Sequence, residues 1–141
     1  RERPFGLDRL DRPRLVTWAA REPDLENRIV AIADTGIDLG DILTGGRVRP
    51  DGVALRWRLT SPRAMLEAGV VPFLIDWGPS PHPSPTAAPG LTLAALEIEH
   101  PDPEHLRKVL DAFGVHLPLR KAPQPALVAT VDLPRGRVEL R

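Results

Sequence analysis

The chain of 141 residues is long enough to bury one hydrophobic core, and its 19 lysines and arginines are balanced by 19 aspartates and glutamates. Without a net positive field, it is not expected to bind nucleic acid or an anionic membrane surface. It has no cysteine, which excludes disulfides, thiolate metal sites and cysteine nucleophiles and favours a cytoplasmic location, and no apolar run reaches the roughly 18 residues of a membrane span.

Residues 1–13 are polar and are expected to form an extended lead-in. The run "RLVTWAA" is strand-like, and the apolar spacing after it predicts an amphipathic helix near residues 24–35. Asp24 is a suitable N-cap for this helix, and Gly36 is a suitable left-handed end. The runs "ILTGGRV", "VALRWRLT" and "VPFLIDW" predict three strands, so residues 14–78 are interpreted as one β-α-β-β-β module.

A proline-rich segment, residues 79–90, follows this module. The chain contains 17 prolines, more than twice the usual share of about 5%. Alternate prolines from Pro79 to Pro85 favour a stiff polyproline-like path that cannot join a sheet. We therefore interpret the segment as a linker.

Residues 91–141 show the same pattern of elements. The strand-like run "LTLAALEIE" precedes a second amphipathic helix near residues 102–113, with Asp102 as its N-cap and Gly114 as its end. The runs "LPLRK", "ALVATVDL" and "RVELR" predict three more strands, and the turn "PRG" joins the last two.

The two predicted helices share one spacing. Pro23 and Pro101 precede them, and Gly36 and Gly114 end them, with the same 78-residue offset. An offset this long indicates a duplicated supersecondary unit. We therefore predict an α+β fold in which two paired β-α-β-β-β modules form a cupped mixed sheet with the helices outside, and we expect a ligand to lie in the cup.

Four stretches carry a resemblance to a known family: "RPDGVALRWRL", "VPFLIDWG", "PHPS" and "LEIEHPDPEHLRKVLDAFGV". Over essentially the whole chain, they resemble bacterial glyoxalase-like domain proteins of the vicinal oxygen chelate superfamily, which includes glyoxalases, extradiol dioxygenases and antibiotic-resistance proteins. Such proteins usually carry an earlier "DH" strand and a "GGxHPxxGT" loop. This sequence has neither, so it resembles their C-terminal two thirds.

The resemblance implies a domain that binds a small polar metabolite in the β-cup. The leading hypothesis is a glyoxalase-like enzyme, of a metal-assisted lyase or isomerase type. The rival is a metal-free binding or sequestering protein, and a dimerisation module is the third possibility. The third follows if an incomplete barrel exposes apolar strand surface that requires a partner. The expected partners are a small-molecule ligand and a second copy of the chain in a homodimer.

The resemblance also implies positions for metal ligands, which in the superfamily are His or Glu residues on the first and last strands of the modules. At the histidine positions this chain has Thr17 and Ala95, and neither is a good ligand. Asp76 and Glu139 lie approximately at the glutamate positions. A divalent metal is compatible with two carboxylates, but without a histidine the ligand set for a transition metal is incomplete, so the cofactor is left unknown.

His82 in "PHPS" is the first candidate catalytic residue. Its flanking prolines either hold it at the rim of the cavity or make it an exposed connector residue. Asp76 alternates with Phe73, Ile75 and Trp77, which are expected to pack, so its carboxylate is expected to point into the cup. Together, His82 and Asp76 would form a pair suited to proton transfer.

Glu97 is the third candidate catalytic residue. Strand alternation places it, with Glu99, on the face opposite Leu96 and Ile98, which are expected to pack against the second helix. Glu97 would therefore face the cup, either in an acid-base or binding role or as a merely hydrated side chain.

Arg56 and Arg58 flank Trp57 on one predicted strand. With Asp76 on the neighbouring strand, they suit either a cross-strand ion pair, which we favour, or a clamp for a substrate carboxylate. Trp77 is the expected substrate-contacting residue beside them.

The remaining polar and aromatic candidates are interpreted as structural. His100 and His105 lie on different elements and lack the helical spacing of a metal pair, so an exposed position near the helix start is expected for both. His116 follows the second helix and is expected to face solvent. Trp18 is expected in the core or in a pocket wall.

Overall fold

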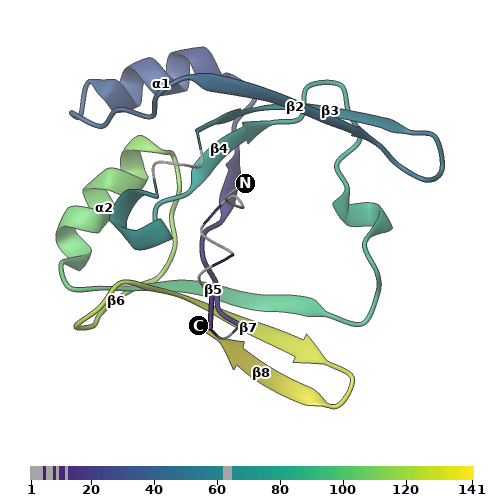
Figure 1. Cartoon of the computed structure of the whole chain (residues 1–141). Helices are drawn as coiled ribbons and strands as arrows, with labels where there is room; N and C mark the ends of the chain where they lie inside the picture. The colour runs from purple at the N-terminus through teal and green to yellow at the C-terminus, as the bar shows by residue number, and fades with distance from the viewer. Residues whose placement is uncertain (1–4, 6–7, 9, 12, 62–64) are drawn as a thin grey trace.

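The computed structural model describes residues 5, 8, 10, 11, 13–61 and 65–141, which form two four-stranded mixed sheets and two α-helices (Figure 1). The first half contains β1 (Ala19–Arg21), α1 (Leu25–Ala33), β2 (Ile42–Val48), β3 (Ala54–Thr60) and β4 (Phe73–Asp76). The second half contains β5 (Thr92–His100), α2 (Pro103–Ala112), β6 (Leu119–Lys121), β7 (Ala126–Leu133) and β8 (Gly136–Leu140). The predicted α+β fold with two β-α-β-β-β units is confirmed.

The two sheets differ in strand order, which the repeat in the sequence did not indicate. The first sheet has the order β1-β4-β3-β2, with β1 and β4 parallel. The second has the order β6-β5-β7-β8, with β5 and β6 parallel. The last strand of the first unit is therefore internal, whereas the last strand of the second unit, β8, is an edge strand.

The predicted helix boundaries are confirmed by their caps. Asp24 Oδ1 accepts a hydrogen bond from the Asn27 amide at 3.4 Å, and Asp102 Oδ1 accepts one from the His105 amide at 3.0 Å. Gly36 and Gly114 follow the helices with φ of 86° and 69°, in the left-handed region that glycine adopts without a steric penalty. The start and stop signals therefore act locally as predicted.

The residues two positions before the N-caps also correspond. The amide of Asp24 donates to Glu22 Oε1 at 3.0 Å, and the amide of Asp102 donates to His100 Nδ1 at 3.1 Å. Glu22 and His100 are therefore equivalent positions, 78 residues apart, and each accepts a hydrogen bond at the start of a helix. One uses a carboxylate and the other an imidazole.

One hydrophobic core joins the two halves. Its fully buried members include Leu25 and Ile32 of α1, Leu74 of β4, Ile98 of β5 and Leu106 of α2. The helices thus pack against one side of the strands, as predicted. No helix in the described part of the chain is long and apolar enough to cross a membrane.

The two segments outside the modules contain no strand among their described residues. Most of the predicted lead-in, residues 1–13, lies outside the described residues, but the Phe5 ring stacks on Phe73 of β4 with a centroid distance of 5.9 Å. The proline-rich segment from 79 to 90 contains a short 3₁₀ turn, Ser84–Thr86, and no strand. It runs from the first sheet to the second (Figure 1).

Candidate functional site

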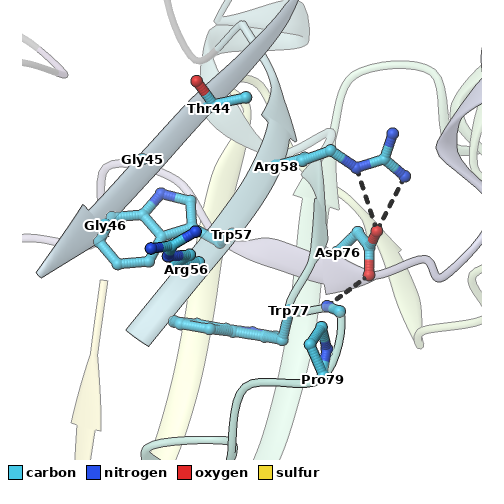
Figure 2. Close-up of a pocket in the computed structure, with 10 residues that line it drawn as sticks. Thr44, Gly45, Gly46, Arg56, Trp57, Arg58, Asp76, Trp77 and Pro79 are labelled. Carbon is cyan, nitrogen blue, oxygen red and sulfur yellow. Dashed lines mark hydrogen bonds and ion pairs between the residues drawn. The ribbon is translucent and has the colours of Figure 1, made fainter. Parts of the chain in front are cut away.

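A cavity of about 630 Å³ lies at the end of β4, and we call it the tryptophan pocket. Three short stretches line it: residues 44–46 of β2, residues 56–58 of β3, and residues 76–79 at the end of β4 and in the turn that follows (Figure 2). Four candidates from the sequence, Arg56, Arg58, Asp76 and Trp77, therefore line one cavity.

Two indoles form the apolar part of the tryptophan pocket. The ring centroids of Trp57 and Trp77 are 5.5 Å apart, with the planes tilted by 59°. Trp57 lies across the strand pair over Gly45, because a Cβ built on Gly45 would be 2.4 Å from Trp57 Nε1. The absence of a side chain at position 45 thus allows the indole to lie in the pocket wall.

Arg58 is fully engaged within the protein. Its Nη2 is 2.9 Å from Asp76 Oδ2, and its Nε is 3.3 Å from the same oxygen (Figure 2). Its Nη1 also binds Glu26 of α1. The hydrogen bonds from Arg58 lower the pKa of Glu26, and those to Glu26 and Asp76 raise the pKa of Arg58. Arg58 therefore forms the cross-strand ion pair with Asp76 that we favoured from the sequence.

Arg56 differs from Arg58 in having a free guanidinium. Its backbone amide donates to Ser80 Oγ at 2.8 Å, but its exposed side chain makes no hydrogen bond or ion pair with the described residues. The pocket therefore holds one compensated arginine and one whose positive charge is available to a ligand.

Asp76 lies on the side of the sheet opposite to the one predicted. Leu74 is fully buried in the core that the helices cover, and alternation places Asp76 on this same side. The prediction that Phe73 and Ile75 form the helix-facing side is wrong, because β4 has apolar residues on both faces and the pattern allowed either orientation. Asp76 lines the pocket only because the strand ends there.

The environment of Asp76 stabilises its carboxylate. The Gly78 amide donates to Oδ1 at 2.7 Å, and Arg58 binds Oδ2. The pKa of Asp76 is lowered, first by the hydrogen bond from Gly78 and then by those from Arg58. This carboxylate therefore serves a structural ion pair and is poorly suited to accept a proton.

This depressed pKa predicts a pH-dependent contribution to stability. The Asp76 carboxylate stabilises the fold above the unfolded-state pKa of about 3.9, and the contribution is lost as the pH falls through the lower folded-state pKa. Asp76→Asn should therefore lower the urea midpoint slightly at neutral pH, and its difference from wild type should vanish in acid. Asp41→Asn, at an exposed position, is the control. A difference that does not change with pH would contradict this assignment.

His82 lies beside the pocket but is bound to its own loop. It is exposed, its Nδ1 is 2.7 Å from Ser84 Oγ, and its ring meets the Trp77 indole edge-on with a centroid distance of 5.5 Å. It lies in an irregular segment between prolines, as expected. The structure gives His82 and Asp76 separate hydrogen-bond partners and does not join them in the expected proton-transfer pair.

Glu97 and Glu139 lie on the second sheet, outside the tryptophan pocket. The Glu97 carboxylate is 3.7 Å from Arg120, and the Glu139 carboxylate is 3.0 Å from Arg141. Glu139 lines a second cavity of about 920 Å³. Residues 13–16, residues 124–127 at the start of β7 and residues 139–141 at the end of β8 are among those that line it.

The implied metal site is not supported by the donors present. Asp76 and Glu139 line different cavities. Across residues 13–61 and 65–141 and the few described before them, no group of three or more His, Asp or Glu side chains is arranged to hold a metal ion. The described residues therefore do not fit the metal centre that the resemblance implied.

A polar cluster that the sequence did not predict lies at Glu67, in the 3₁₀ segment Leu66–Gly69. Its carboxylate is 3.3 Å from His100 Nε2 and 3.2 Å from His105 Nε2. His100 is buried, which corrects the expected exposed position, whereas His105 is exposed. The segment between β3 and β4 that contains Glu67 has no periodic pattern of apolar residues, so no signal in the sequence pointed to Glu67. Through these two contacts, Glu67 links the segment to β5 and α2.

The two remaining candidates are structural. His116 is exposed as expected, with Nδ1 3.3 Å from Asp111 Oδ1. Trp18 packs against the core, and its indole N–H donates to Val70 O at 2.8 Å. It is the tryptophan that does not line the pocket.

Comparison with protein-family models gives a match over residues 1–114 to the family described as glyoxalase-like domain. Comparisons with curated proteins and with solved structures give no match. The match covers the tryptophan pocket and both helices, and it ends at the glycine that terminates α2.

Proposed function

Because the chain belongs to the glyoxalase-like domain family, we propose that it binds a small metabolite carrying a carboxylate in the tryptophan pocket. The observation that carries this proposal is the free guanidinium of Arg56, a residue that lines the same cavity as two indoles and an Arg58 whose charge is already compensated. A cavity of about 630 Å³ is within the size range of small-ligand sites.

The chemistry of the lining favours a flat or partly apolar acid. A free guanidinium presents a planar set of donors that matches a carboxylate in two parallel hydrogen bonds. Indole faces provide apolar area for the rest of the molecule. The indole N–H groups of Trp57 and Trp77 donate to no described residue, so they are available as further donors.

Binding is favoured over catalysis by the state of the polar groups. Asp76 is held as a carboxylate by Gly78 and Arg58, and His82 Nδ1 is bound to Ser84. The described donors also form no metal-ligand group. These features support the metal-free binding or sequestering protein among the alternatives, with Arg56 and Trp77 as ligand contacts.

Arg56→Gln tests this proposal. Benzoate is the probe, with benzyl alcohol as an uncharged analogue, and calorimetric titration gives the dissociation constant. Loss of a charge-assisted hydrogen-bond pair worth about 1.5–3 kcal/mol should weaken benzoate binding at least about tenfold. Benzyl alcohol should bind weakly to both proteins.

Arg47→Gln is the matched control, because Arg47 is an exposed arginine on β2 outside the pocket and makes no hydrogen bond or ion pair with the described residues. It should bind benzoate as the wild type does. Equal binding by the wild type and Arg56→Gln, or equal loss in both variants, would contradict the role of Arg56.

A further inference from the structure

The second cavity, of about 920 Å³, is separate from the tryptophan pocket. Four stretches of the chain contribute to its wall: residues 13–16, the segment 65–70 before β4, residues 124–127 and residues 139–141. Among the residues that the structure describes, none lines both cavities. The last two stretches lie beyond residue 114, where the match to the glyoxalase-like domain family ends. Part of the second cavity is therefore built by sequence outside that match.

Contacts between distant parts of the chain hold the wall of the second cavity together. The Leu15 amide donates to Arg141 O at 3.2 Å, which joins the N-terminal segment to the C-terminus (Figure 1). Gly69 approaches the N-terminal segment so closely that a Cβ at this position would overlap with Val16 O. The segment 65–70 therefore lies directly against the N-terminal segment, and the second cavity is formed by the fold itself.

Most of the residues around the second cavity are apolar. They make up ten of the fourteen described residues that line it, and two of them, Val70 and Leu127, also belong to the buried core. Leu140 is a large aliphatic residue that lines the cavity and remains 46% exposed. Met65 has an unbranched, flexible side chain, which adapts to ligands of different shapes. A hydrocarbon chain would remove this apolar surface from water.

One charged group of the second cavity has no partner within the described protein. Arg141 is compensated, because its Nη1 is 2.6 Å from the Glu99 carboxylate and its Nε is 3.0 Å from that of Glu139. Arg14 is exposed and makes no hydrogen bond or ion pair with any residue that the structure describes. Its guanidinium is therefore available to an anionic group, and a carboxylate matches its planar set of donors.

We propose that the second cavity binds a medium-chain fatty acid, with the hydrocarbon chain against the apolar wall and the carboxylate on Arg14. Each part of this ligand matches one feature of the lining, whereas a short polar acid would leave the apolar wall in water. The volume is within the size range of small-ligand sites. The inference concerns a different cavity and a different class of acid from the proposed function, and it does not depend on that function.

The Trp18 indole is the reporter for this cavity, because its N–H donates to the carbonyl oxygen of Val70, which lines the cavity. Decanoate is the probe, and it is titrated into the Arg56→Gln protein to weaken competing binding in the tryptophan pocket. In ¹H–¹⁵N correlation spectra, we expect the Trp18 indole resonance to shift and those of Trp57 and Trp77 to stay unchanged. Shifts confined to Trp57 and Trp77, or no shift of Trp18 throughout the titration, would overturn the proposal.

Two substitutions in the same background test the contacts, with the dissociation constant of decanoate measured by calorimetric titration. Arg14→Gln should weaken binding at least about fivefold, because a charge-assisted hydrogen bond is lost. Leu140→Ser should weaken it at least about twofold, because part of the apolar wall is lost. The controls are Arg107→Gln, at an exposed arginine on α2, and Leu91→Ser, at a leucine that is 67% exposed; neither residue lines the cavity.

A series of chain lengths tests the apolar wall. From hexanoate through octanoate to decanoate, the affinity should rise about twofold to fourfold for each CH₂ group that is added and buried. Circular dichroism confirms that each variant is folded. Equal affinity across the series, or an equal effect of a substitution and its control, would contradict the proposed ligand.

Discussion

Gly45→Ala is expected to displace the Trp57 indole and to weaken benzoate binding about 100-fold, or about 2.7 kcal/mol. The new Cβ would lie 2.4, 2.6 and 2.8 Å from three atoms of the Trp57 side chain, closer than non-bonded heavy atoms approach. Because Trp57 also packs against Trp77, the indole cannot shift without changing the pocket wall. Overpacking of this kind typically costs about 1–3 kcal/mol of stability.

A double-mutant cycle identifies the clash as the cause. In a Trp57→Ala background, Gly45→Ala should cost little stability or even increase it, because alanine is better than glycine inside a strand. The measurement is the free energy of unfolding of all four proteins in urea. The same cost in both backgrounds would show that Trp57 is not what Gly45 accommodates.

Leu74→Ala is expected to lower the free energy of unfolding by about 2–5 kcal/mol. Leu74 is fully buried in the core shared by both helices, and its strand β4 lies between β1 and β3. Truncation leaves a cavity that rigid neighbours cannot fill. Urea unfolding measures the change.

Leu43→Ala is the control for this prediction, because Leu43 lies on the edge strand β2 and is 42% exposed. Its effect on the free energy of unfolding should be clearly smaller. Equal effects of the two truncations would contradict the placement of Leu74 in the shared core.

Features that depend on nearby residues were predictable from the sequence. The helix starts at Asp24 and Asp102 and the stops at Gly36 and Gly114 rest on hydrogen bonds and dihedral angles within a few residues of each position. Most strands were likewise identified from their β-branched and apolar content.

Features that depend on distant parts of the chain were not predictable. The two sheets have different strand orders although their units have the same order along the chain, because pairing is decided between segments far apart in sequence. The side that Asp76 faces depended on whether Leu74 or its neighbours met the helices, and β4 is apolar at all these positions. Glu67 meets His100 and His105 only through the tertiary fold.

Within the candidate site, the sequence predicted the residue types but not their partners. Arg56 and Arg58 are equivalent in the pattern, two positions apart on one strand. Only the position of Glu26 on α1 and of Asp76 on β4 leaves Arg58 compensated and Arg56 free. The functional distinction between the two arginines is therefore a property of the fold.

The most direct test of the proposed binding site uses the three tryptophans as reporters. In ¹H–¹⁵N correlation spectra, each gives one indole N–H resonance, and Trp18 is outside the pocket with its N–H bound to Val70 O at 2.8 Å. Titration with benzoate should shift the indole resonances of Trp57 and Trp77 and leave that of Trp18 unchanged. A shift of Trp18 alone, or no shift of either pocket indole at saturating benzoate, would contradict the account.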